Sequence, residues 1–204
     1  MLENSEKVKI EQYIDKIIVA LSNEAIKSLS NGVSEKQVVD RLLNSTINKL
    51  TPESKSILSS VYNMMMEKTL SEPEFIDVKN KASFYEMDIL KDLSNKFDFE
   101  IPSDIHFEET QKTINEWVAA GAVVTVGSVI SISLQNWIPV CIAVVIAGIM
   151  TIVLKANKPK NCKDIKSIID EYLGSVKSSL LNWIDTIERY YDEQVSYLKE
   201  RLGI

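Results

Sequence analysis

Residues that commonly carry out catalysis or bind metals are scarce in this chain of 204 residues. His106 is the single histidine, and the two cysteines, Cys141 and Cys162, have no histidine near them in sequence. Zinc sites and histidine-activated nucleophiles therefore lack the partners that they need. The six glycines form no phosphate-binding or dinucleotide-binding loop. We expect no cofactor and no enzymatic activity.

A cluster of positive charge is also missing. The net charge is -6, whereas a nucleic-acid-binding domain usually presents a basic face, so we expect no nucleic-acid partner. The sequence starts Met1-Leu2-Glu3-Asn4 and continues with charged residues. It does not show the basic region and apolar run of a secretory signal. This pattern indicates synthesis and initial residence in the cytoplasm.

The most prominent feature that is present is the stretch 117–154, which has no charged residue and is bounded by Glu116 and Lys155. It divides at Gln135 and Asn136 into two apolar arms. As a helix, each arm would be about 27 Å long, which is close to the thickness of about 30 Å of the hydrocarbon core of a bilayer. The stretch therefore predicts a membrane-inserted helical hairpin.

Small residues in the first arm leave other interpretations open. Gly121, Thr125 and Ser128 share one helical face, and small residues of this kind allow close helix packing in lipid. One alternative is a hairpin that is buried in a soluble bundle and inserts only on a trigger. Another is a β-hairpin tongue, because valine, isoleucine and threonine also suit strands.

The hairpin is predicted to contact lipid tails through large apolar side chains. These are Trp117, Val123, Val124, Ile130, Leu134, Trp137, Ile138, Val140, Ile146 and Ile152. Lysines after the second arm are predicted to meet lipid headgroups, because basic flanks stay on the cytoplasmic side and attract anionic lipids. They are Lys155, Lys158, Lys160 and Lys163. The predicted location is a membrane, with the other helices on its cytoplasmic side, and both full spanning and shallow insertion remain open.

The rest of the chain has the apolar spacing of amphipathic helices, in steps of three and four. This spacing predicts helices over about residues 5–31, 34–50, 51–65, 73–95 and 164–202. Gly32 is expected to end the first helix, and Ser34 to begin the second in a capping box with Gln37. Pro52 is expected at the first position of the third helix, where its missing N–H costs little.

These patterns divide the chain into four parts: a helical bundle over 1–97, an extended acidic connector over 98–116, the apolar hairpin over 117–154, and a basic collar with a long helix over 155–204. The last helix is expected to pack back on the first part. The predicted fold class is all-α: an elongated helical bundle with a long C-terminal helix and a protruding apolar helical hairpin.

The connector contains the acidic run Asp98-Phe99-Glu100-Ile101-Pro102. A helical bundle, this connector, a small-residue-rich apolar hairpin and a long returning helix together resemble the stalk and membrane-paddle half of bacterial dynamin-like proteins. The GTPase domain of that family is missing from this sequence. The resemblance implies bilayer binding and remodelling by hairpin insertion, self-association through the helices, and a chain that is either a fragment or a partner of a separately encoded GTPase.

Two other classes of protein also fit the pattern. An α-helical pore-forming toxin or membrane-disrupting defence effector carries an apolar hairpin between long amphipathic helices as well. A small integral-membrane scaffold, whose cytoplasmic bundle recruits a partner, is the third class. All three share the lipid bilayer as a partner.

Overall fold

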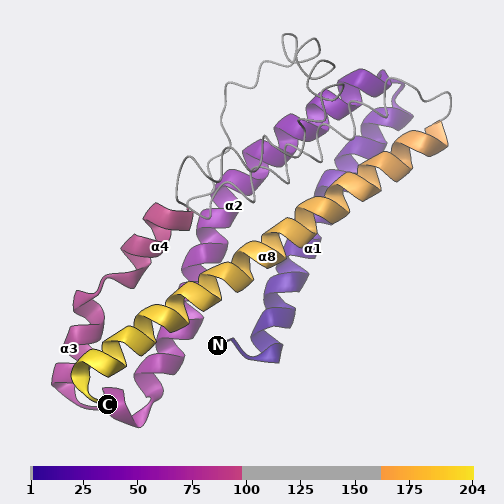
Figure 1. Cartoon of the computed structure of the whole chain (residues 1–204). Helices are drawn as coiled ribbons and strands as arrows, with labels where there is room; N and C mark the ends of the chain where they lie inside the picture. Colours follow the sequence, from indigo (N-terminus) through magenta and orange to yellow (C-terminus); the bar gives the residue numbers. More distant parts are fainter. Residues whose placement is uncertain (1, 98–161) are drawn as a thin grey trace, which may run out of the picture.

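The computed structural model describes residues 2–97 and 162–204, and this part of the chain is all-α, without strands. Its elements are α1 (Asn4–Ser30), α2 (Glu35–Ser71), the 3-10 helix η1 (Pro73–Phe75), α3 (Val78–Glu86), α4 (Ile89–Phe97) and α8 (Cys162–Leu202). The long helices α1, α2 and α8 contact one another, and the short α3 and α4 lie against α8 (Figure 1). The prediction of an all-α helical bundle is confirmed for the described residues.

The start of the chain follows its sequence pattern closely. Apolar residues of α1 at the predicted spacing are buried: Ile10, Ile14, Ile17, Leu21 and Ala25. Gly32 has a φ of +76°, and its amide donates to the carbonyl of Leu29 while the amide of Val33 donates to that of Ser28. This glycine-based C-cap is the predicted end of the helix. Ser34 is the N-cap of α2 as expected, but its side chain makes no capping hydrogen bond, so the predicted capping box is wrong.

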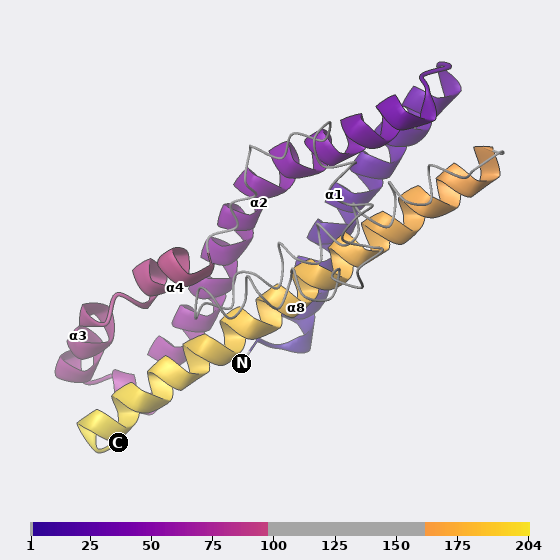
Figure 2. The same ribbon diagram turned by 45° about the horizontal axis from the view of Figure 1, so that its top comes forward.

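α2 is a single helix of 37 residues, and the division predicted at Pro52 is wrong. Proline removes one backbone hydrogen bond and typically costs about 3 kcal/mol inside a helix. Apolar burial continues on both sides of it, with Leu50 and Ile57 almost fully covered, and this packing offsets the cost. The hydroxyl of Thr51 donates to the carbonyl of Ile47 at 2.9 Å. α2 changes direction partway along its length (Figure 2).

The single helix predicted over 73–95 is instead divided into η1, α3 and α4. The carboxylate of Asp77 accepts hydrogen bonds from the amides of Lys79 and Asn80, which starts α3. Asp88 has a φ of +45° and separates α3 from α4. The breaks let short helices turn their apolar residues into the core. Those buried are Phe75, Phe84, Ile89, Leu93 and Phe97.

α8 runs for 41 residues and contacts α1, α2, α3 and α4. The long helix predicted over 164–202 is therefore present, and Gly174 lies inside it without interrupting it. The apolar stripe of α8 is buried along its length: Ile165, Ile169, Tyr172, Val176, Leu180, Trp183, Ile187, Tyr191, Val195 and Leu198. The core is thus built jointly by helices from both sides of residues 98–161.

Candidate functional site

The residues predicted to touch a bilayer fall almost entirely outside the described part of the chain. These are Trp117, Val123, Val124, Ile130, Leu134, Trp137, Ile138, Val140, Ile146 and Ile152, together with Lys155, Lys158 and Lys160. Lys163 belongs to the first turn of α8. The acidic connector also lies outside the described residues. Among the helices of residues 2–97 and 162–204, none combines the length and the apolar character needed to cross a membrane.

The structure does show where the bundle holds the two flanks of residues 98–161. The ring of Phe97, at the end of α4, packs against the ring of Tyr190 in α8, with centroids 5.6 Å apart. The other flank is Cys162, the first residue of α8. Tyr190 follows Cys162 by 190 − 162 = 28 residues, or about 42 Å along the helix axis. In Figure 1 the end of α4 lies beside the second half of α8, well away from the beginning of α8.

One turn of α8, residues 188–191, is in contact with all four of the other α-helices, and we call it the hub turn. Glu188 pairs with Lys7 of α1, and Tyr190 packs on the end of α4. The hydroxyl of Tyr191 donates to Thr69 of α2 at 2.9 Å, and its ring makes an edge contact with Phe84 of α3. Figure 1 shows α3 and α4 beside the second half of α8, whereas α1 runs mainly along the first half.

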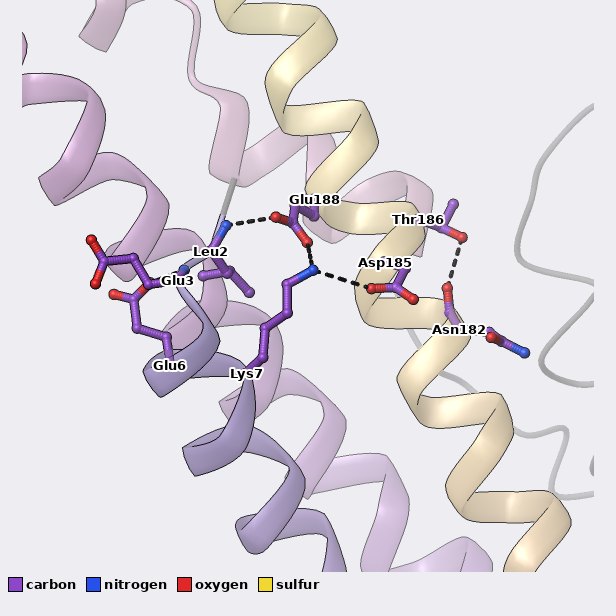
Figure 3. Close-up of polar contacts among 8 residues, drawn as sticks. All are labelled: Leu2, Glu3, Glu6, Lys7, Asn182, Asp185, Thr186 and Glu188. Atoms are coloured by element: carbon purple, nitrogen blue, oxygen red, sulfur yellow. Dashed lines mark hydrogen bonds and ion pairs between the residues drawn. The ribbon is translucent and has the colours of Figure 1, made fainter.

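Glu188 is the most unusual residue of the hub turn, because its carboxylate is buried and only 3% of the residue is exposed. One carboxylate oxygen accepts the backbone N–H of Leu2 at 2.6 Å. The other lies 2.8 Å from the ammonium group of Lys7, which is also 3.7 Å from Asp185 (Figure 3). The hydrogen bond to Glu188 raises the pKa of Lys7 above its ordinary value of 10.5. Charge and hydrogen bonding together compensate the burial of this carboxylate.

A cavity of about 460 Å³ opens beside this pair. It is lined by Lys7, Asn182, Asp185, Thr186, Glu188 and Arg189. Within the described ranges, no group of three or more histidine, cysteine, aspartate or glutamate residues is placed to hold a metal. Both oxygens of Glu188 are occupied by donors from the beginning of the chain. Its contacts are those of a structural link between α8 and the first residues.

Sequence reasoning missed Glu188. The available signal is its position, four residues after Ile184 and three before Tyr191, which are both buried. That spacing places a carboxylate within the apolar stripe of α8. Its partners are not visible in the sequence, because Leu2 is 186 positions away.

Comparisons with protein-family models, with curated proteins and with solved structures find no match to this chain.

Proposed function

We propose that this protein binds a lipid bilayer by inserting residues 117–154 as an apolar helical hairpin, and that it remodels or scaffolds the bilayer without a GTPase domain of its own. The observation that carries the proposal is the uncharged stretch itself, followed at once by Lys155, Lys158, Lys160 and Lys163. A charge near the middle of a membrane helix costs about 2.5–3.5 kcal/mol on insertion scales, and this stretch avoids that cost throughout.

The bundle supports this proposal by the way in which it holds the flanks of the stretch. α1, α2 and α4 precede the stretch, α8 follows it, and all of them pack into one core. A hairpin whose flanks both enter one folded bundle has both ends on the same side of a bilayer. This arrangement agrees with the lysine flank, since basic residues favour the cytoplasmic side.

The separation of the flanks gives the predicted connector a role. Tyr190, against which Phe97 packs, lies about 42 Å from Cys162 along α8. Residues 98–116, at about 3.3 Å per residue in an extended chain, reach about 60 Å. The connector is thus long enough to bring the first arm of the hairpin alongside the second, which ends 162 − 154 = 8 residues before α8. In this proposal, an extended connector is what lets a hairpin form from flanks so far apart.

The test is flotation of the full chain with anionic liposomes. The wild type is compared with a variant in which residues 117–154 are replaced by a glycine–serine linker. We expect the wild type to float with the vesicles and the variant to remain in the dense fraction. A wild type that stays dense at every lipid composition, or a deletion variant that floats equally well, would overturn the proposal.

The lysine flank is tested by changing the four lysines to glutamate together. Each lysine near an anionic surface contributes about 1 kcal/mol, or roughly a fivefold change in affinity. The fourfold variant is expected to lose binding to anionic vesicles and to keep its weaker binding to neutral ones. Equal losses on both kinds of vesicle would show that the lysines act through folding.

The second candidate is a pore-forming toxin or membrane-disrupting effector, favoured by the 41-residue amphipathic α8 that follows the apolar stretch. Liposomes loaded with a fluorescent dye distinguish the two. Release of dye from vesicles of unchanged shape supports the pore, whereas tubulated or tethered vesicles that retain their dye support remodelling. Binding without either effect supports a scaffold.

A further inference from the structure

The short helix α3 is apolar on its outward side as well as on the side that faces the core. Phe84 of α3 is buried, and its ring makes an edge contact with Tyr191 of α8. Val78 and Tyr85 are nevertheless 80% and 53% exposed, and Ile76, just before the helix, is 75% exposed. Large apolar side chains that gather on one surface mark a contact surface, whereas single ones do not.

Three exposed residues form this outward surface, which we call the α3 face: Val78, Ala82 and Tyr85. Their spacing of four and three residues places them on one side of the helix. Ala82, in the middle, is small enough for the backbone of a second helix to approach closely. α3 lies at the edge of the bundle in both views (Figures 1 and 2), so the α3 face is open to a partner.

The charged residues beside the α3 face favour a protein partner over a bilayer. Residues 77–86 contain two lysines, one aspartate and one glutamate, so their net charge is zero and an anionic lipid surface would attract them little. One flank of the face has Lys79 near the beginning of the helix and Glu86 at its end, both exposed. These two lie seven residues apart, about 10.5 Å along the axis, which is too far for them to pair with each other.

A second copy of α3 that runs antiparallel to the first fits both the apolar and the charged positions. A two-fold axis beside Ala82 places Val78 of one copy opposite Tyr85 of the other. The same axis sets equal flanks side by side in reversed direction, so Lys79 of each copy lies next to Glu86 of the other. We propose that this protein forms a symmetric dimer in which the α3 faces of two copies pack antiparallel. The dimer does not depend on insertion of residues 117–154.

The test reverses the charges of the flank in the full chain. Lys79→Glu makes the flank acidic and Glu86→Lys makes it basic, so each variant repels its own copy. Both changes suit the helix dipole, and α3 should therefore stay folded. In sedimentation equilibrium with a non-ionic detergent, each variant should dimerise on the order of tenfold more weakly than the wild type. An equimolar mixture of the two should dimerise as the wild type does, because both pairs are then attractive.

Restoration in the mixture is the decisive result, since a defect confined to one chain cannot be repaired by the other variant. A wild type that stays monomeric up to roughly 100 μM would overturn the dimer. Single variants that associate as strongly as the wild type, or a mixture that associates no better than its components, would overturn it as well.

Lys81 tests the orientation of the two helices. It lies on the other flank, one residue from Ala82, so an antiparallel pair brings the two copies of Lys81 close together. Lys81→Gln should therefore strengthen the dimer about twofold, whereas Lys79→Gln should weaken it by a similar factor. Weakening by both changes would overturn the antiparallel arrangement.

The apolar contact is tested by Val78→Ser, with Val19→Ser in α1 as the matched control. Val19 is also exposed, at 56%, and serine and valine have similar helix propensities. Because each copy contributes one valine, Val78→Ser should weaken the dimer by about tenfold or more, and Val19→Ser should leave it unchanged. Equal effects would overturn the α3 face as the contact. Unchanged association together with weaker flotation of Val78→Ser on liposomes would assign the face to the bilayer instead and overturn the dimer.

Discussion

The two halves of α8 are held by different kinds of contact. In the second half, residues 183–202, buried polar groups have partners on other elements: Glu188 binds Leu2 and Lys7, and Tyr191 binds Thr69 at 2.9 Å. In the first half, residues 162–182, the buried hydroxyl of Ser179 donates only within α8, to the carbonyl of Ser175 at 2.7 Å. The buried hydroxyl of Tyr172 has no hydrogen-bond partner within the described structure. Lys177 pairs with the exposed carboxylates of Glu11 and Asp15, at 2.8 and 2.7 Å.

This difference bears on how specifically each half of α8 is positioned against the other helices. Apolar burial stabilises a helix without fixing its register, because the hydrophobic effect has no direction. Buried hydrogen bonds have defined geometry and are costly to break. The second half of α8 is thus positioned specifically, whereas the first half, which adjoins the lysine flank, is held mainly by apolar packing and by screened surface pairs.

The largest effect on stability is expected when the ion pair between Lys7 and Glu188, in the second half of α8, is removed. Lys7→Gln should lower the free energy of unfolding by about 2 kcal/mol. The loss of one partner of a fully buried pair costs about 3–5 kcal/mol, and the value is reduced here because the Lys7 side chain is 43% exposed and Glu188 keeps the Leu2 amide. Urea denaturation followed by circular dichroism measures it. Lys177→Gln should leave the transition midpoint unchanged, and equal losses would show that the two halves do not differ.

A smaller effect is expected for Tyr191→Phe. This change leaves the buried hydroxyl of Thr69 without its donor, which should cost about 1 kcal/mol. Thr69→Val combined with Tyr191→Phe removes both hydroxyls and should recover part of the loss. A single variant as stable as the wild type would mean that the buried hydrogen bond contributes nothing.

The pH dependence of the free energy of unfolding should reveal the contribution of the ion pair between Lys7 and Glu188. Because the hydrogen bond to Glu188 raises the pKa of Lys7 in the folded state above 10.5, the stabilisation is fully present below pH 10.5 and is lost as pH rises through the folded pKa. The stability gap between wild type and Lys7→Gln should therefore narrow between pH 10 and 12, although other groups lower the stability of both proteins. A gap that stays constant over this range would contradict the assignment.

The smallest effect is expected for Tyr172→Phe. Burial raises the pKa of Tyr172 to about 12, and the neighbouring hydroxyl of Thr46 partly offsets this rise. Within the described residues, the Tyr172 hydroxyl has no partner at full hydrogen-bond geometry. Removal of this hydroxyl should leave the free energy of unfolding unchanged or slightly higher. A loss as large as that of Tyr191→Phe would reveal a partner for Tyr172 and remove the contrast between the two halves.

The sequence predicted long helices well where a continuous stripe and a terminator coincide, as in α1 with Gly32. It failed at Pro52, because a proline at the first position of a helix and a proline inside one look alike locally, and packing on both sides decides between them. It also missed the break at Asp88, whose left-handed backbone is uncommon outside glycine. Glu188 was missed because its donors come from the opposite end of the chain. The lipid-contacting residues remain a prediction.

The length of α8 has a mechanical consequence. The helix is unbroken from Cys162 to Leu202, so a tilt of its axis about Glu188 would also move Cys162 and the buried stripe between them. Cys162 lies 188 − 162 = 26 residues before Glu188, about 39 Å away, and a tilt of about 10° would therefore swing it by about 7 Å. A small tilt of the helix axis at Glu188 would thus produce a larger displacement of Cys162, the first residue of α8.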